Sequence, residues 1–177
     1  LLLFKEKSKR MPLPSGLKAP MLPFKSRLQM NLRRTTSNNP DFKNLVVALD
    51  QVLAFLDGDD HAFYAQFNKS DHLNHVVVYY DGNEALGCGA FRPYEQETVE
   101  IKRMYTKPES RGKGVAQAVL YELESWAKEL GFTDCILETG YKQVEAIGLY
   151  QKAGYQTIAN YGQYAGVENS VCMQKAI

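Results

Sequence analysis

Apolar residues recur with a helical period in several stretches of the chain. Between residues 42 and 56 they return every three or four positions, and Asn39 followed by Pro40 just before this stretch is a helix-start signal. A second apolar stripe runs from Val115 to Leu130 and stops at Gly131, a residue type that commonly ends helices. The pattern therefore predicts helices from Pro40 to about residue 57 and from about residue 112 to 130, with shorter helices over 61–69 and 143–153.

The segments between these helices alternate apolar and polar residues or are apolar throughout, which is typical of strands. Residues 76–80 and 85–92 flank the turn sequence DGNE and predict a hairpin, and residues 98–106 follow as a third strand. Further strands are predicted over 30–36, 134–139, 155–159 and 170–176. Helices and strands in this order predict an α/β fold, with a mixed central sheet flanked by helices.

The first 29 residues show neither period. They contain four prolines, and residues 1–30 carry seven Lys and Arg against Glu6 alone, a formal charge of +6. Since the net charge of all 177 residues is +1, the rest of the chain carries −5. We therefore expect residues 1–29 to be an extension outside the core, with a docked arm as the alternative, and residues 30–177 to form one domain.

Charge and cysteine usage exclude several function classes. An acidic body gives no support for a nucleic-acid-binding protein, because phosphate contacts normally require a basic surface on the domain itself. Cys88, Cys135 and Cys172 are far apart and lack the spacing of metal ligands, so we expect reduced, mostly buried thiols and no metal. No apolar run approaches the roughly 20 residues of a membrane span, so we expect a cytoplasmic protein without membrane contact.

The sequence RGKGVA (Arg111–Ala116) lies between a predicted strand and a predicted helix. Amide groups at a helix start have no partner within the helix and attract anions. Gly112 and Gly114 let an anion approach the backbone without a Cβ in the way, and Arg111 and Lys113 add positive charge. A nucleotide P-loop is disfavoured because Gly114 follows Lys113 where that motif needs Ser or Thr, and a dinucleotide site is disfavoured because G-x-G-x-x-G is absent. A glycine turn with solvated cations is the alternative.

This turn resembles the acyl-CoA-binding motif Gln/Arg-x-x-Gly-x-Gly/Ala of the GNAT family of N-acetyltransferases, carried here by Arg111, Gly114 and Ala116. The segment RMYTKPESRGKGVA (residues 103–116) follows the family's strand-to-loop pattern, and EAIGLYQKAGY (residues 145–155) matches its later helix and strand. The resemblance covers residues 30–177 and departs at Gln143, where the family often has Asn. It implies the GNAT acyl-CoA N-acyltransferase fold, with splayed parallel strands at the cofactor site and acetyl-CoA as cosubstrate.

The resemblance also implies which residues bind the cofactor. The splayed strands would be residues 98–106 and 134–139, and amides near the end of the first would bind the pantetheine arm and polarise the thioester carbonyl. Main-chain donors of residues 111–116 would bind the diphosphate. The implied cofactor-binding residues are therefore Met104, Tyr105, Thr106, Arg111, Gly112, Lys113, Gly114, Val115, Ala116 and Gln143.

Attack by an alkyl ammonium on a thioester requires that the ammonium first lose a proton, so the site needs a base or a water path to one. Glu100 is the first candidate, because alternation places it on one strand face with Lys102 and Met104, where family members often hold a carboxylate. A glutamate paired with Lys102 is the structural alternative. Glu138 on the neighbouring strand is the second candidate. Tyr150 matches the family's helix tyrosine and would protonate the departing thiolate, with core packing as its alternative.

These implications combine into one expected function. We expect an enzyme that moves acetyl from acetyl-CoA to a primary amine by direct attack in a ternary complex, with a small amine favoured over a protein amine. The alternative is a non-catalytic acyl-CoA-binding or sensing module with the same fold. The family often forms homodimers, which is a further expectation. Tyr161, Tyr164 and Glu168 lie in a loop that often borders the acceptor pocket, whereas His61, His72 and His75 are interpreted as surface residues and Cys135 as a packing residue.

Overall fold

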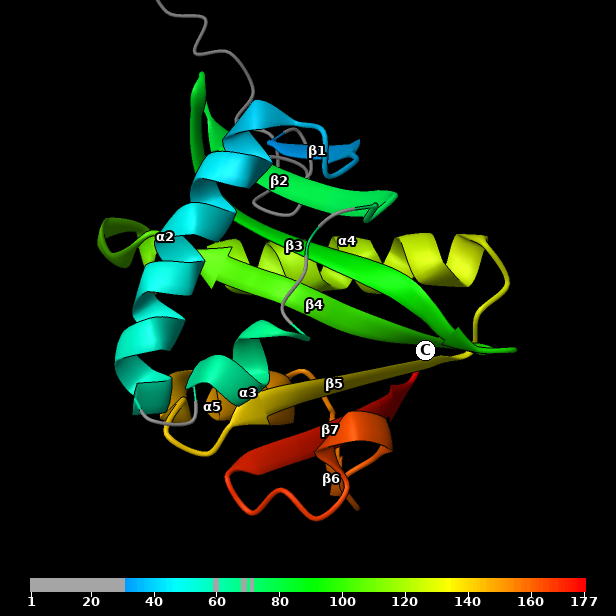
Figure 1. Cartoon of the computed structure of the whole chain (residues 1–177). Coiled ribbons are helices and arrows are strands. Elements are labelled where there is room, and N and C mark those ends of the chain that lie inside the picture. The colour runs from blue at the N-terminus through cyan, green and yellow to red at the C-terminus, as the bar shows by residue number, and fades with distance from the viewer. Residues whose placement is uncertain (1–30, 59–60, 68–69, 71) are drawn as a thin grey trace, which may run out of the picture.

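The computed structural model describes residues 31–58, 61–67, 70 and 72–177, so the predicted extension over 1–29 lies outside the described residues. The strands are β1 (Leu32–Thr35), β2 (His75–Asp81), β3 (Glu84–Glu95), β4 (Thr98–Thr106), β5 (Asp134–Gly140), β6 (Gln156–Ile158) and β7 (Ser170–Ala176). They form one sheet in the order β1-β2-β3-β4-β5-β7-β6 (Figure 1). β4 and β5 pair in parallel and the other neighbours pair antiparallel, which confirms the predicted mixed sheet.

Helices cover both faces of this sheet. α2 (Pro40–Asp57) and α3 (His61–Ala65) lie in front of it in Figure 1, and α4 (Val115–Glu129) and α5 (Val144–Lys152) lie behind it. α2 begins as predicted, since the side chain of Asn39 accepts a hydrogen bond from the amide of Phe42 at 3.0 Å. α4 begins later than predicted because the residues before it form a turn. Two short 3₁₀ helices, η2 (Pro108–Ser110) and η3 (Gly162–Tyr164), were not expected from the periodicity.

Each face of the sheet has its own hydrophobic core. Val119 and Leu123 of α4 pack with Val77 of β2 on one face, whereas Phe42 of α2 packs with Val76 on the other. Because both faces are covered, β2 is buried on both sides and shows an apolar run instead of alternation. The three cysteines are buried and free, as expected of reduced thiols.

β4 and β5 separate towards their carboxyl ends. Their pairing joins Thr98–Ile101 to Asp134–Leu137 and stops there, although β4 continues to Thr106 and β5 to Gly140. The main-chain groups along the inner edges of the two strands therefore have no partner strand over these last residues. This is the splay that the sequence resemblance implied.

A bulge in β4 accounts for this separation. The register between β3 and β4 shifts, so that Arg103 and Met104 stand opposite the single residue Gly89. Arg103 has a φ of 58°, a conformation that residues with side chains rarely adopt, and such a bulge bends its strand. The expected alternation is wrong beyond this point, because Met104 packs towards the core beneath α4, where a Cβ on Gly89 would overlap its sulfur. Met104 therefore does not share a face with Glu100.

Candidate active site

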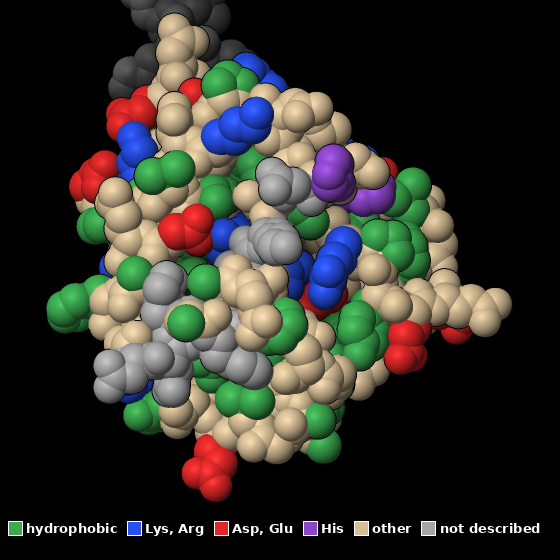
Figure 2. Space-filling model, viewed as in Figure 1, with side chains coloured by type: hydrophobic (Ala, Val, Ile, Leu, Met, Phe, Trp, Pro, Cys, Tyr) green, Lys and Arg blue, Asp and Glu red, His purple; other side chains and the backbone are tan. Residues whose placement is uncertain are grey.

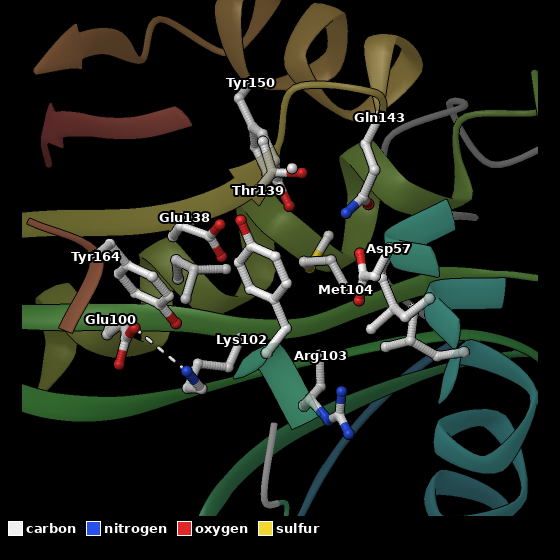
Figure 3. A pocket seen from close by; sticks show the side chains of 15 residues that line it. Asp57, Glu100, Lys102, Arg103, Met104, Glu138, Thr139, Gln143, Tyr150 and Tyr164 are labelled. Carbon is white, nitrogen blue, oxygen red and sulfur yellow. Dashed lines mark hydrogen bonds and ion pairs between the residues drawn. The ribbon is translucent and has the colours of Figure 1, made fainter. Parts of the chain in front are cut away.

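A cavity lies where β4 and β5 separate, on the side of the sheet covered by α2 and α3 (Figure 3). Leu49 and Leu53 of α2 form part of its apolar wall. Its polar lining comes from several elements: Glu100 and Lys102 of β4, Glu138 of β5, Gln143 just before α5, Tyr150 of α5 and Tyr164 of η3. The fold thus brings the three residues with predicted catalytic roles, Glu100, Glu138 and Tyr150, to one cavity from three separate elements.

Glu138 occupies a poorly hydrated position on the β5 wall. Its Oε1 accepts a hydrogen bond from Ser170 Oγ at 2.7 Å, and that Oγ lies 3.2 Å from the hydroxyl of Tyr64. Burial raises the pKa of the Glu138 carboxyl to about 7, against the opposing effects of Ser170 and of the Lys102 charge. A carboxyl with this pKa is well matched to general base catalysis near neutral pH.

Glu100 belongs to a buried ion-pair network. Its side chain is 1% exposed, Oε2 accepts from Arg92 Nε at 2.7 Å, and Oε1 accepts from Lys102 Nζ at 3.2 Å and from the Tyr161 hydroxyl at 3.4 Å. Both oxygens of the Glu100 carboxylate therefore already accept hydrogen bonds from protein groups. The contacts of Glu100 are those of its salt-bridged alternative, whereas the carboxyl of Glu138 accepts from the uncharged Ser170.

Tyr150 points from α5 into the cavity (Figure 3). Its ring packs edge-to-face on Tyr155, with 5.7 Å between the centroids, so the residue also contributes to the core. Among the residues that the structure describes, none forms a hydrogen bond with the Tyr150 hydroxyl. Burial, and to a smaller extent the charge of Glu138, raises the pKa of Tyr150 above its usual value. Tyr150 therefore stays protonated and has a proton to donate to a ligand.

The end of β4 presents two of its amides to the gap. N–H groups along a strand alternate between its two edges, and the amide of Lys107 donates to the carbonyl of Leu86, next to β3, at 2.9 Å. The amides of Thr106 and Met104 must then point to the opposite edge, towards β5, whereas the amide of Tyr105 points towards β3. Of the three amides expected on the cofactor, those of Met104 and Thr106 are suitably directed and that of Tyr105 is not.

The turn at residues 111–116 lies on the surface directly after η2. Gly112 and Gly114 have φ angles of 72° and 83°, and a Cβ on either would meet no atom within 4 Å. Glycine is therefore favoured at both positions because of the positive φ angle, and not because a side chain would clash with a neighbour. The carbonyl of Gly114 accepts the first hydrogen bond of α4, from Ala118 at 3.0 Å, which leaves the amides of residues 115–117 without a partner inside the helix.

The side chains of this turn are arranged consistently with an anion site. Arg111 and Lys113 are exposed, and Arg111 Nε donates to the carbonyl of Thr106 at 3.3 Å, which ties the turn to the end of β4. Val115 is buried and anchors the helix start, and Ala116 is half-buried. Free amides, two cations and an open surface fit the diphosphate of an acyl-CoA.

Some of the remaining predicted site residues lie at the cavity and others lie away from it. The side-chain amide of Gln143 points into the cavity, as Figure 3 shows, and Tyr164 lines it. Tyr161 reaches the network through Glu100, whereas Glu168 is exposed. The loop that carries them therefore contributes two tyrosines, and not its carboxylate, to the region of the cavity.

The histidines differ from one another. His72 is exposed, as expected, and the side chain of His61 lies outside the described part of the structure. The interpretation of His75 as a surface residue is wrong, because its ring stacks on Phe91 at 4.4 Å between centroids and meets Trp126 edge-on. Burial lowers the pKa of His75, so this residue contributes packing.

Sequence reasoning missed the positions of three polar residues in or beside the cavity. Ser170 and Tyr64 support Glu138 from elements distant in sequence, so no local pattern indicates them. Lys102 lines the cavity as a buried cation, although it was considered only as a partner for Glu100. Its position two residues after Glu100 on a strand was a usable signal, because alternate residues share a face.

Charges are scattered over the face shown in Figure 2, where single basic side chains stand among acidic, apolar and other residues. None of the helices within the described residues is long and apolar enough to cross a membrane. Likewise, the described part of the chain contains no group of three His, Cys, Asp or Glu side chains that could hold a metal ion.

Comparison with known sequences identifies a family. Residues 42–155 match the profile of the Acetyltransferase (GNAT) family. The chain is also 30% identical, over 137 residues, to the uncharacterized N-acetyltransferase YjgM of Escherichia coli, an alignment that covers 71% of this chain and 81% of YjgM.

Solved structures share the architecture. A Klebsiella pneumoniae protein provisionally named an acyl-CoA N-acyltransferase superimposes with a TM-score of 0.68 at 29% identity, covering 82% of this chain and 95% of that one. A GNAT family acetyltransferase from Elizabethkingia anophelis, solved with acetyl-CoA bound, has the same fold with a TM-score of 0.59 at 17% identity, covering 82% and 97% of the two chains.

Proposed function

The chain belongs to the GNAT family of acetyltransferases, and from this premise we propose that it transfers the acetyl group of acetyl-CoA to a primary amine by direct attack in a ternary complex. The observation that carries the proposal is the gap between β4 and β5, beside which lie a carboxyl with a pKa of about 7 and a tyrosine hydroxyl without a partner among the described residues. The first suits a base and the second suits an acid.

Binding of the cosubstrate is assigned to the turn and to the gap. The free amides at the start of α4, with Arg111 and Lys113, would hold the diphosphate. The amides of Met104 and Thr106 would hold the acyl arm, and one of them would donate a hydrogen bond to the thioester oxygen as negative charge develops there. When bound, acetyl-CoA supplies an acyl carbon that is open to attack by an amine.

Glu138 is assigned the role of general base. The acceptor arrives as an ammonium, and the ionised Glu138 removes one proton from its nitrogen. The neutral amine then attacks the thioester carbonyl carbon, so that a C–N bond forms while the C–S bond breaks. A base with a pKa near 7 is about half ionised at neutral pH and accepts the proton without holding it too tightly.

Tyr150 is assigned the role of general acid. The sulfur that leaves the acyl carbon is an anion in a poorly hydrated site, and the Tyr150 hydroxyl can donate its proton to it. The nitrogen, now bonded to the acyl carbon, loses its second proton to solvent, so the products are an N-acetylated amine and the free thiol of CoA. Solvent then returns a proton to Tyr150, and Glu138 releases the proton that it took from the amine.

Replacing Tyr150 by Phe should lower kcat about 10-fold while the affinity for acetyl-CoA changes less than about 2-fold. The effect is modest because a thiolate with a pKa near 8.5 is a fair leaving group even without a proton donor. The packing on Tyr155 is retained in the variant, so its unfolding temperature should stay close to that of wild type. An unchanged kcat would remove Tyr150 from the mechanism.

Turnover separates this proposal from the alternative of an acyl-CoA-binding module. The experiment supplies acetyl-CoA with a panel of amines and follows release of the CoA thiol and the mass of the products. An enzyme releases thiol in step with N-acetylated product. A binding module binds acetyl-CoA in a calorimetric titration but releases no thiol with any amine.

The small volume of the site favours a small acceptor over a protein amine. The cavity lies beneath α2 and α3, and its wall includes the buried Tyr164. We further propose a cytoplasmic location, supported by the three free, buried cysteines. A homodimer remains a prediction.

A further inference from the structure

Lys102 is a buried cation that the proposed mechanism does not use. Its side chain is 7% exposed and lines the cavity on the β4 wall. An ammonium has three N–H donors. Among the residues that the structure describes, Lys102 donates to one acceptor, Oε1 of Glu100 at 3.2 Å. The ammonium therefore has donors left for a molecule in the cavity.

Most of the acceptor capacity of Glu100 is already used by other donors. Its Oε2 is occupied by Arg92 at 2.7 Å, and its Oε1 already accepts from both Lys102 and the hydroxyl of Tyr161. Two cations thus share the carboxylate of Glu100, so Arg92, Glu100 and Lys102 together carry one net positive charge, beside the acidic side chains Glu138 and Asp57 of the same lining. This cationic group can accept one further anion.

Burial makes this arrangement costly without a ligand. Loss of hydration lowers the pKa of Lys102, against the effect of Glu100, which shows that the ammonium is poorly solvated. A buried charge is stable when its hydrogen bonds are completed. Arg103, the other cation of the lining, is already paired with Asp50 at 2.7 Å. Lys102 is therefore the cation of the cavity that is best suited to an anionic group of a ligand.

The base stands on the other strand of the gap. Glu138 of β5 and Lys102 of β4 both line the cavity, and each influences the ionisation of the other (Figure 3). The cavity thus offers a proton acceptor on one wall and a cation on the other. Leu49 and Leu53 of α2 and Tyr164 of η3 add apolar surface to the lining. This combination suits a small molecule that has an amine, an anion and an apolar part.

We propose that the acceptor is an apolar α-amino acid, whose carboxylate pairs with Lys102 while its ammonium gives a proton to Glu138. The assignment rests on the proposed acetyltransferase function and narrows its acceptor to amines that carry a carboxylate. Glu100 is then a positioning residue, which with Arg92 fixes the Lys102 ammonium. The acceptor carries a carboxylate although the chain beyond residue 30 is acidic overall, because local charge outweighs the charge of a distant surface.

Matched triplets of acceptors test the proposal. One triplet is L-methionine, L-methioninamide and 3-(methylthio)propylamine, and the other is L-phenylalanine, its amide and phenethylamine. In each triplet the second compound keeps the side chain and amine but lacks the carboxylate charge, and the third lacks the carboxylate altogether. For the wild-type protein, kcat/KM should be about 10- to 100-fold higher for the amino acid than for either relative. The Lys102→Met variant should reduce that ratio to about 1, and Lys102→Arg, which keeps the charge, should restore part of it.

The outcomes separate this proposal from the function on which it rests. If amides or simple amines are acetylated as well as the amino acids, or if Lys102→Met keeps the preference, the amino acid assignment is overturned while the transferase stands. If no amine in the panel releases CoA thiol, the proposed function itself fails. Should Lys102→Met not fold, as judged by its unfolding temperature, the comparison of triplets on the wild-type protein decides alone.

Discussion

The Glu138→Gln variant is expected to lose about 10²- to 10³-fold in kcat, the usual contribution of a positioned general base. Glutamine keeps the size of the side chain and an oxygen that accepts from Ser170, so the fold and the affinity for acetyl-CoA should change little. The measurement is the rate of CoA thiol release at saturating acetyl-CoA and acceptor. Full activity in this variant would exclude Glu138 as the base.

The pH dependence gives an independent readout of the same residue. Because the pKa of Glu138 is about 7 and the base must be ionised, log kcat of the wild-type protein should rise with pH, with a slope near one, and bend at about pH 7. The bend should vanish in Glu138→Gln. Glu100→Gln is the matched control, since it removes the neighbouring carboxylate: it should raise the acceptor KM through Lys102 and keep the bend. If the bend instead disappears in Glu100→Gln and persists in Glu138→Gln, the base is Glu100.

The Gly114→Val variant is expected to raise KM for acetyl-CoA about 100-fold. This is the effect expected from losing one or two charge-assisted hydrogen bonds to the diphosphate. Gly114 has a φ of 83°, which a β-branched residue scarcely tolerates, so the turn must rearrange and its amides turn away from the diphosphate. The unfolding temperature should change much less than KM, because nothing lies within 4 Å of the added Cβ. Initial rates over a range of acetyl-CoA concentrations measure the effect.

Gly131→Val is the matched control for that variant. Gly131 follows the opposite end of α4, has a φ of 90°, and likewise has no atom within 4 Å of an added Cβ. The backbone strain is therefore similar while the anion site is untouched. Gly131→Val should leave KM for acetyl-CoA within about 2-fold of wild type. An equal rise in both variants would mean that strain, and not a lost phosphate contact, causes the effect.

The conformation of the turn at residues 111–116 could be predicted from the sequence because its determinants are local. Positive φ angles at Gly112 and Gly114 follow from glycine next to a helix start, and the order of strand, turn and helix fixes where the amides lie. The resemblance added the gap between β4 and β5. No periodicity indicates this gap, because the two strands diverge after Ile101 and Leu137 without any change in the kind of residues they contain.

The surroundings of the candidate catalytic residues were less accessible to prediction because they depend on burial and on long-range pairs. Glu100 and Glu138 look alike on their strands, and only the fold shows that Arg92 neutralises the first while burial raises the pKa of the second. The bulge at Arg103 also has no signature in the sequence, so simple alternation misplaced Met104. The misplaced face of Met104 arose where the tertiary structure overrides a local pattern.

A calorimetric titration of the wild-type chain with acetyl-CoA and, separately, with S-acetylpantetheine, which carries the same thioester but lacks the diphosphate and the adenosine 3′-phosphate, tests the central claim most directly. If the main-chain donors at residues 111–116 hold the diphosphate, acetyl-CoA should bind at least about 100-fold more tightly than the truncated thioester. Equal affinities, or no binding of acetyl-CoA, would contradict the account.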